Sequence, residues 1–545
     1  MGESEKIDMA FEDFNLASIS KEYPLLIQNL SHLVNREDYL RRIWALEQRW
    51  KSFVENPKHF NEVVVFDYAP ENADVERGFD IIYAGGTLGL LHATLMSLKY
   101  SRRVLVFDAF KVGKTHRDWN ISDEELQEFV KSGLFTHEEL QRAIVNRYRY
   151  GFVKFYDANS KVKAPPLRME NVLNVAIDAD KLLSLALEKI RKTNSKIVDY
   201  LRLNRVYVLR HEVLVECEEV KTRRKRFFAG RLFIDATGTN SNVSRQLNSG
   251  RSITHVCPTV GTVAKGFERG FDKNEVDFSV GEILVSTEDI TDGRQLIWEG
   301  FAGDPLRDEY TTYLFFYDSV DSSTNKSLFR LFEEYFEKLP QYKARDRSWR
   351  VVKPVFGYIP SFHHKGWRNL KQVAVDRVLL MGDAAGLSSP LTFCGFGSFV
   401  RNFRKLTTLT QQALENNELN QSTLSNICAY ESNVAQMASL AEFMRPTPKS
   451  KPSVVNETMN AVMMALSKLE PEIARELFRD RMRFASFKQL LIKTATLHPK
   501  VFKLMFEHLG IKGAFWWIAN ILEAFLDERE PDFRAIRNIE GKNSI

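Results

Sequence analysis

A glycine-rich stretch at residues 382–397 has the residue types and spacing of a ligand-binding loop. It follows an apolar run at residues 378–381 that predicts a strand, and a helical pattern begins near Ser398. Such a passage can bring backbone close to a polar ligand, and Asp383 can accept hydrogen bonds from ligand hydroxyl groups. The free N–H groups at the start of the helix favour an anionic ring or a phosphate. Alone, the stretch is equally compatible with an ordinary turn.

A second candidate ligand-binding segment is a strand–turn–helix–strand unit at residues 79–108. An apolar run that predicts a buried parallel strand precedes a glycine-rich turn, and the second strand ends at Asp108. This acid lies about 20 residues after the glycines, the spacing of a ribose contact. In register with the G-x-G-x-x-G pattern, the three positions are Ala84, Gly86 and Gly89. We therefore predict an adenine-dinucleotide site, with a purely structural turn as the alternative.

The third candidate segment is an apolar strand at residues 232–235 that ends in the small-residue turn Ala236-Thr237-Gly238. Such a turn can lie beside the adenosine half of the same ligand, although it is a common strand end. The order of the three segments resembles the FAD-binding pattern of the flavoprotein hydroxylase superfamily. That superfamily includes monooxygenases, geranylgeranyl reductases and lycopene cyclases. The resemblance extends over positions 80–397 and so covers most of the chain.

A narrower resemblance appears between and after these segments. The chain is similar to the CruA/CruP family of lycopene cyclases, which are FAD-binding carotenoid enzymes. The same residues fit both the cyclase branch and its paralogue branch. The similarity rests on the Ala-Gly-Gly-Thr-Leu-Gly turn and on four strings, at residues 115–122, 256–264, 295–301 and 356–360.

The motifs and the resemblance together predict a non-covalent FAD site, because no His or Cys is placed for a flavin linkage. The resemblance implies that FAD is reduced during activity, with NAD(P)H as an indirect electron donor. Arg117 is expected to pair with phosphate or, alternatively, with Asp118 at the surface. The expected cofactor-binding residues are Ala84, Gly85, Gly86, Thr87, Leu88, Gly89, Asp108, Arg117, Asn120, Ala236, Thr237, Gly238, Gly382, Asp383, Gly386, Pro390, Gly395 and Gly397.

The resemblance implies cyclisation of lycopene, which changes no net oxidation state and begins with protonation of an alkene. That reaction needs a carboxylic acid in an apolar pocket, where desolvation keeps the acid protonated. Glu299, between Trp298 and Gly300 in an apolar strand-like run, fits this description, and Asp318 is the second candidate. The alternative is that either acid faces solvent at a strand end.

Aromatic residues near these acids are expected to line the pocket and offer π faces to a cation, or else to pack in the core. They are Trp298, Phe301, Phe315, Phe316 and Tyr358. Two other functions fit the flavin motifs equally well. One is an FAD-dependent oxidoreductase, either a monooxygenase or an isoprenoid reductase. The other is a non-catalytic paralogue that binds flavin or carotenoid.

The amino-acid composition limits the classes of function and the cellular compartments that fit the chain. The 545 residues are 44% hydrophobic, enough for a large core, and the net charge of +5 gives no argument for nucleic acid. Four scattered cysteines indicate neither a disulfide framework nor a metal site and favour a reducing compartment. We expect no signal peptide, transit peptide or transmembrane span, and a cytoplasmic location.

The elements that must position these residues predict an α/β fold. We expect a Rossmann-like βαβ domain of the glutathione-reductase type, an antiparallel-sheet substrate domain and helical extensions at both ends. Basic and aromatic residues on the apolar C-terminal helices indicate peripheral contact with the cytoplasmic or thylakoid membrane, or alternatively a buried helix pair. The predicted parts are a helical extension (1–76), the first FAD segment with a β-hairpin insertion (77–255), the substrate domain (256–375), the second FAD segment (376–445) and a helical C-terminal region (446–545).

Overall fold

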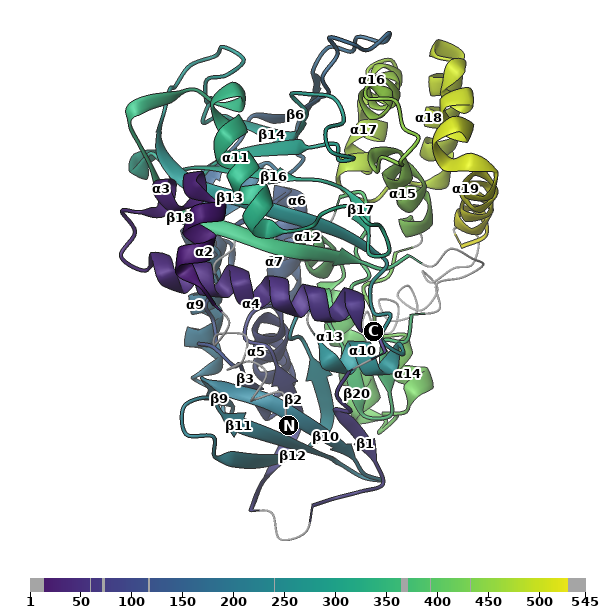
Figure 1. The fold of residues 1–545 in the computed structure, drawn as a ribbon. Helices are drawn as coiled ribbons and strands as arrows, with labels where there is room; N and C mark the ends of the chain where they lie inside the picture. Colours follow the sequence, from purple (N-terminus) through teal and green to yellow (C-terminus); the bar gives the residue numbers. More distant parts are fainter. Residues whose placement is uncertain are drawn as a thin grey trace.

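The computed structural model has two large sheets, one above the other, with helices on their outer faces (Figure 1). The structure describes residues 14–58, 60–70, 74–115, 118–239, 241–363, 371–392, 394–431 and 433–527. The predicted fold class is confirmed, because a mixed Rossmann-like sheet and a mainly antiparallel sheet are both present. The exact domain boundaries stay a prediction.

The lower sheet contains the predicted βαβ unit. Its strands follow the order β1-β10-β11-β12-β2-β3-β9, and β20 adds to β12. The central strand β2 pairs in parallel with β3 and β12, and its last four residues are buried, as expected for a strand covered on both faces. The β10–β11–β12 antiparallel part is the predicted hairpin insertion. The bounds are β1 (Val64–Phe66), β2 (Val75–Ala84), β3 (Val104–Phe107), β9 (Lys196–Val198), β10 (Leu201–Val208), β11 (Val213–Glu219), β12 (Lys225–Asp235), β19 (Ala374–Val375) and β20 (Val378–Leu380).

Helices cover the lower sheet and hold its carboxyl edge. Helix α5 follows β2 directly and packs against α9 and α13, and nine of its residues are buried. This all-round burial matches its nearly continuous apolar sequence. The helices of this layer are α5 (Leu88–Tyr100), α6 (Asp123–Leu126), α7 (Glu128–Ser132), α8 (His137–Ala143), α9 (Ala179–Ile190), α10 (Asn242–Leu247), α12 (Gly395–Arg401), α13 (Phe403–Glu415) and α14 (Gln421–Ser425).

The upper sheet has the order β17-β13-β16-β15-β14-β6-β7, with β18 also paired to β13. Helix α11 (Leu328–Tyr342) packs on one face, where the Tyr335 hydroxyl group lies 2.6 Å from the Oγ1 atoms of Thr262 and Thr312. The other face looks toward the lower sheet. The bounds are β6 (Tyr150–Lys154), β7 (Leu167–Met169), β13 (His255–Phe267), β14 (Val280–Val285), β15 (Ile297–Ala302), β16 (Tyr310–Phe315), β17 (Asp318–Ser319) and β18 (Arg345–Ser361). A small third sheet joins β4 (Trp119–Ile121), β8 (Val175–Ile177) and β5 (Ile144–Arg147).

The N-terminal part is helical only as far as Glu55, which differs from the predicted extension over residues 1–76. Helices α2 (Leu16–Glu22), α3 (Pro24–Leu30) and α4 (Arg36–Glu55) are followed by β1, which joins the lower sheet in parallel with β10. The Gln246 side chain fixes this strand, since its Oε1 atom accepts hydrogen bonds from the backbone of Val63 and Val64. Figure 1 shows α4 running across the border between the two sheets.

The C-terminal helices form a separate group beside the upper sheet (Figure 1). They are α15 (Val434–Ala441), α16 (Val454–Leu466), α17 (Pro471–Phe478), α18 (Phe484–Leu497) and α19 (Lys500–Asp527). Helix α19 is kinked at Gly510, whose φ is +67°. Within the described ranges, no helix has the length and apolar character needed to cross a membrane.

Candidate functional site

A cavity of about 2480 Å³ lies between the two sheets and brings most of the predicted site residues together. Its walls come from the carboxyl edge of the lower sheet, the inner face of the upper sheet and helix α4. Among the predicted residues, it is lined by Ala84, Gly85, Thr87, Leu88, Asp108, Asn120, Ala236, Thr237, Gly238, Gly382, Asp383, Gly395 and Glu299. The residues Gly86, Gly89, Gly386, Pro390, Gly397 and Asp318 are not part of this lining. Arg117 lies outside the described residues.

The turn between β2 and α5 brings backbone close to the cavity. Gly85 has a φ of +115°, and a Cβ atom there would lie 2.2 Å from the carbonyl oxygen of Ala236, so only glycine fits. Helix α5 then begins at Leu88, and the side chain of its N-cap residue, Thr87, makes no capping hydrogen bond. The first turn of the helix can therefore donate to an anionic ligand.

Asp108 is held in position by this turn. One carboxylate oxygen accepts from Gly86 N at 2.7 Å and the other from Phe110 N at 2.8 Å. Burial raises the pKa of the Asp108 carboxyl group, whereas these hydrogen bonds oppose that rise. Each oxygen keeps a further lone pair, so the carboxylate can also accept from ribose hydroxyl groups.

Two fingerprint glycines allow close packing within the protein, and their contact with a cofactor stays a prediction. A Cβ atom at Gly86 would lie 2.8 Å from the Cα atom of Val112, so the restriction comes from a neighbouring loop. A Cβ atom at Gly89 would lie 3.1 Å from the Cβ atom of Ala236, which sets the close approach of α5 to the strand-end turn. Gly86 contributes indirectly by orienting Asp108.

The turn after β12 is organised by a fully buried carboxylate. Asp235 accepts from Thr237 N at 2.9 Å, from Thr237 Oγ1 at 2.6 Å and from Ser241 Oγ at 2.6 Å. Burial raises the pKa of Asp235, and the three donors oppose this effect. The Thr237 hydroxyl group is thus committed to the turn, and Gly238, with φ of +88°, presents backbone to the cavity.

The glycine-rich loop after β20 places Asp383 against the start of α12. A Cβ atom at Gly395 would lie 2.8 Å from Asp383 Oδ1, so glycine allows the carboxylate to reach this position. Lys371 lies behind the loop, where a Cβ atom at Gly386 would approach its Nζ atom to 2.9 Å. Burial lowers the pKa of the Lys371 ammonium group to about 7, and the nearby Asp383 opposes that fall.

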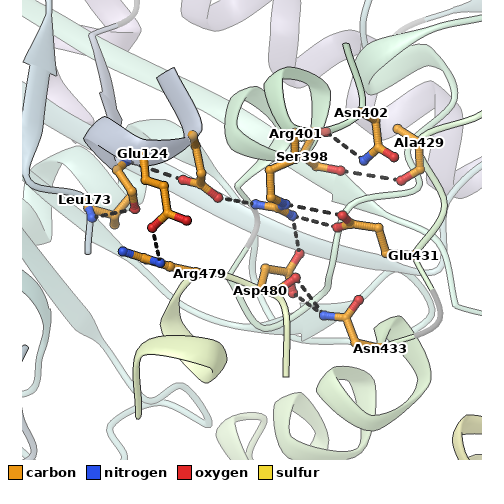
Figure 2. Close-up of polar contacts among 12 residues, drawn as sticks. Glu124, Leu173, Ser398, Arg401, Asn402, Ala429, Glu431, Asn433, Arg479 and Asp480 are labelled. Atoms are coloured by element: carbon orange, nitrogen blue, oxygen red, sulfur yellow. Dashed lines mark hydrogen bonds and ion pairs between the residues drawn. The ribbon is translucent and has the colours of Figure 1, made fainter. Parts of the chain in front are cut away.

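A buried ionic cluster, absent from the predicted site, anchors helix α12 (Figure 2). The Arg401 guanidinium group lies 2.8 Å from Glu125, 2.7 Å from Glu431 and 3.4 Å from Asp480. Burial raises the pKa of Asp480 to about 6, which Arg401 opposes, and Asn433 donates to the Asp480 carbonyl oxygen at 2.7 Å. The cluster therefore ties the loop-bearing helix to α6 and to the C-terminal helices. Its members are far apart in the sequence, so no local pattern indicates it.

The string at residues 118–120 joins three parts of the cavity wall. Asp118 forms an ion pair with Lys353 of β18 at 2.9 Å and accepts from Thr311 Oγ1 at 3.2 Å. The Trp119 ring stacks on Phe396 of α12, with ring centroids 4.3 Å apart and planes at 13°. Asn120 lines the cavity. This strand thus connects the upper sheet to the glycine-rich loop.

Glu299 faces the cavity from strand β15. It lies opposite Tyr313 of β16, which also lines the cavity, whereas Trp298 points to the other face and stacks on Tyr342 at 4.6 Å. Among the described residues, the Glu299 carboxyl group has no hydrogen-bond or ion-pair partner. Burial raises its pKa to about 8, so the group carries a proton at neutral pH and can donate it to a substrate in the cavity.

Asp318 occupies a different environment. Its carboxylate is buried, forms an ion pair with Lys326 Nζ at 2.9 Å and accepts a hydrogen bond from Ser322 Oγ. These contacts brace the turn after β17 and leave Asp318 outside the cavity lining. Of the predicted aromatic residues, Phe301, Phe315 and Tyr358 line the cavity, whereas Trp298 and Phe316 are buried in the core.

Solved structures with the same fold include several flavoproteins. The geranylgeranyl bacteriochlorophyll reductase-like protein from Thermoplasma acidophilum aligns with a TM-score of 0.52 and 14% identity, covering 79% of this chain and 98% of that chain. The p-nitrophenol 4-monooxygenase PnpA from Pseudomonas putida DLL-E4 aligns with a TM-score of 0.51 and 15% identity, covering 76% of this chain and 98% of that chain. Halogenase PltM in complex with phloroglucinol and FAD aligns with a TM-score of 0.53 and 12% identity, covering 85% of this chain and 94% of that chain. No protein-family model and no curated protein matches the sequence.

Proposed function

We propose that the protein is an FAD-dependent oxidoreductase that acts on a large apolar substrate. The observation that carries this proposal is one continuous cavity, which connects the dinucleotide-type turns of the lower sheet to an aromatic and acidic wall on the upper sheet. The similar folds give it further support, since they are described as reductase-like, monooxygenase and halogenase proteins.

The described residues fit FAD. The turn at Gly85 and the open N-terminus of α5 can bind the diphosphate group, and Asp108 can accept from the adenosine ribose. The loop around Asp383 can hold the flavin ring beside the upper sheet. Bound FAD would supply redox chemistry, with NAD(P)H as the proposed source of electrons.

The substrate end combines an apolar wall with one proton donor. Phe301, Phe315 and Tyr358 make this part of the cavity apolar, which strengthens electrostatic effects there. Glu299 stands among them as a protonated carboxylic acid. Saturation of a carbon–carbon double bond requires a proton at one carbon, and Glu299 is placed to provide it.

Glu299 also supports a second candidate function, acid-initiated cyclisation of lycopene to β-ionone rings. Here the Glu299 proton adds to a terminal alkene, an internal alkene attacks the resulting carbocation, and a ring proton leaves, so no net oxidation occurs. Cavity-lining aromatic rings can stabilise the transient cation. The geometry at Glu299 serves both reactions, and the products distinguish them.

Product analysis in a lycopene-accumulating host tests both candidates. Saturated or oxygenated carotenoids would support the oxidoreductase, and cyclised ends would support the cyclase. In either case the Glu299→Gln variant should accumulate far less product while keeping its flavin. Unchanged lycopene, together with failure of the purified protein to oxidise NADH or NADPH with any isoprenoid supplied, would contradict both functions and favour a non-catalytic paralogue.

We also propose that helix α19 rests on a lipid surface. Trp517 packs edge-on against Phe443, so one side of the helix is held by the protein. The opposite side exposes large apolar residues, with Ile511 87% and Phe515 65% exposed. The exposed Lys512 follows Ile511 directly and suits anionic lipid headgroups. The remaining exposed apolar residues of the face are Ile518, Leu522 and Leu526.

A further inference from the structure

Helix α4 forms a wall of the cavity, a role that nothing in the sequence motifs indicates. It lies across the border between the two sheets (Figure 1). Cavity-lining residues cover a broad sector of it, and those at the centre of this sector recur at helical spacing. These residues are Asp38, Arg42, Leu46, Arg49 and Phe53.

Two contacts fix α4 to the upper sheet and its helix. Glu47 accepts from Ser327 Oγ at 2.7 Å and from Phe329 N at 3.0 Å, at the start of α11. Trp50 stacks on Tyr358, with ring centroids 4.5 Å apart and planes at 18°. These contacts hold the helix in one orientation, so its cavity-facing side chains have a defined position.

Arg42 lies at the nucleotide end of the cavity. Its guanidinium group is 5.9 Å from the centroid of the Phe110 ring, and the backbone N–H of Phe110 donates to Asp108. Within the described part of the chain, no carboxylate lies at ion-pair distance from Arg42. Arg42 is thus an exposed cation on the cavity wall, with no ion pair to another described residue.

Arg202 of strand β10 follows backbone that pairs with the segment 108–110. Its neighbour Leu201 donates from its backbone to the Asp108 carbonyl oxygen at 2.8 Å, and Tyr200 donates to that of Phe110 at 3.0 Å. The Nη1 atom of Arg202 is buried and has no hydrogen-bond partner among the described residues, although Arg202 lines the cavity. A buried donor without an acceptor is costly, which favours a ligand that supplies one.

We propose that α4 closes the adenosine end of the cavity and that Arg42 and Arg202 bind the phosphate groups of the dinucleotide. The proposal rests on the proposed function, since the dinucleotide is FAD. A diphosphate is dianionic and offers several acceptor oxygens, and guanidinium groups match that geometry well. The N-terminal helix is then part of the binding site.

Binding measurements with matched ligands test this proposal. The purified apoprotein is titrated with FAD, ADP and riboflavin, and each affinity is measured by fluorescence or calorimetry. Arg42→Gln and Arg202→Gln should each weaken FAD and ADP roughly 10- to 100-fold, the usual effect of losing a charge-assisted hydrogen bond. Riboflavin has no phosphate, so its affinity should not change. Lys51→Gln is the control, because Lys51 lies exposed on α4 outside the cavity lining.

A second readout follows the helix itself. Hydrogen exchange across residues 36–55 should slow when FAD or ADP binds to the wild type, and less so in the two arginine variants. If the wild type binds FAD and both variants bind it equally well, the role of α4 is wrong and the proposed cofactor stands. If the wild type binds neither FAD nor ADP, the proposed function itself fails. If Lys51→Gln weakened FAD and ADP binding as much as the arginine variants do, the loss of affinity would reflect net charge alone. That result would overturn the proposal.

Discussion

Replacing Glu299 by glutamine removes the proposed proton donor and keeps the size of the side chain. Burial raises the Glu299 pKa from its usual 4.5 to about 8. This difference corresponds to roughly 5 kcal/mol against the charged form, and at pH 7 about nine-tenths of the molecules carry the proton. If that proton begins the reaction, Glu299→Gln should reduce product formation by about two to four orders of magnitude.

The same pKa makes stability depend on pH in a defined direction. The folded pKa exceeds the unfolded one, so the stability contributed by this proton is fully present below pH 4.5 and is lost as pH rises through about 8. Between about pH 6 and pH 9, the wild type should lose roughly 3 kcal/mol that Glu299→Gln keeps.

Infrared difference spectroscopy measures the proton directly. The band of a protonated carboxyl group should disappear from the wild type with a midpoint near pH 8 and should be absent from Glu299→Gln. Asp318→Asn is the matched control and should retain both the band and the activity, because Asp318 is paired with Lys326 away from the cavity. A midpoint near 4.5 would refute the argument from burial, and full activity in Glu299→Gln would show that the proton comes from elsewhere. Loss of activity in Asp318→Asn alone would reverse the assignment of the two acids.

Three further predictions follow from the loop, the ionic cluster and the exposed helix. Thr87→Glu places a negative charge at the start of α5, so repulsion of the diphosphate should lower FAD affinity roughly 100-fold. The neutral Thr87→Gln variant should have little effect. Equal FAD affinities of the two variants would show that the diphosphate binds elsewhere. Arg401→Met leaves the buried carboxylates of Glu125 and Asp480 and the partly buried one of Glu431 without their cation. It should destabilise the protein by about 3–5 kcal/mol, seen as a lower melting temperature. An unchanged melting temperature would show that the cluster does not stabilise the fold. The double change Ile511→Ser with Phe515→Ser should abolish sedimentation of the protein with anionic liposomes. Phe271→Ser, at an exposed site outside α19, should not affect sedimentation. Wild-type protein that does not bind liposomes would contradict the lipid contact.

The sequence specifies the nucleotide half of the cavity more fully than the substrate half. Strand β2 runs directly into the turn at Gly85, and Asp108 follows β3, the next strand along the chain. The βαβ connection alone therefore brings these features together. The packing of Gly86 against Val112 was not predicted, because spacing rules do not describe this loop neighbour. The cluster around Arg401 lacks any local signal for the same reason, since its partners meet only after folding.

On the upper sheet, both faces are buried, so an alternating pattern does not say which face borders the cavity. Glu299 and Trp298 are adjacent, and from the sequence either side chain could face the cavity. The positions of α11 and the lower sheet decide that Glu299 does so and that Trp298 packs under α11. Asp318 has similar apolar neighbours, but its pairing with Lys326 is a tertiary contact. Helix α4 is readable as a helix, whereas its place over the cavity depends on contacts with α11 and β18.

A crystal structure of the protein with added FAD tests the central claim most directly. The account predicts a diphosphate group at the N-terminus of α5 between Arg42 and Arg202, the ribose at Asp108, and the flavin ring along the loop at Asp383 on the side that faces Glu299. FAD bound outside this cavity, or a cavity that stays without FAD at saturating concentration, would contradict it.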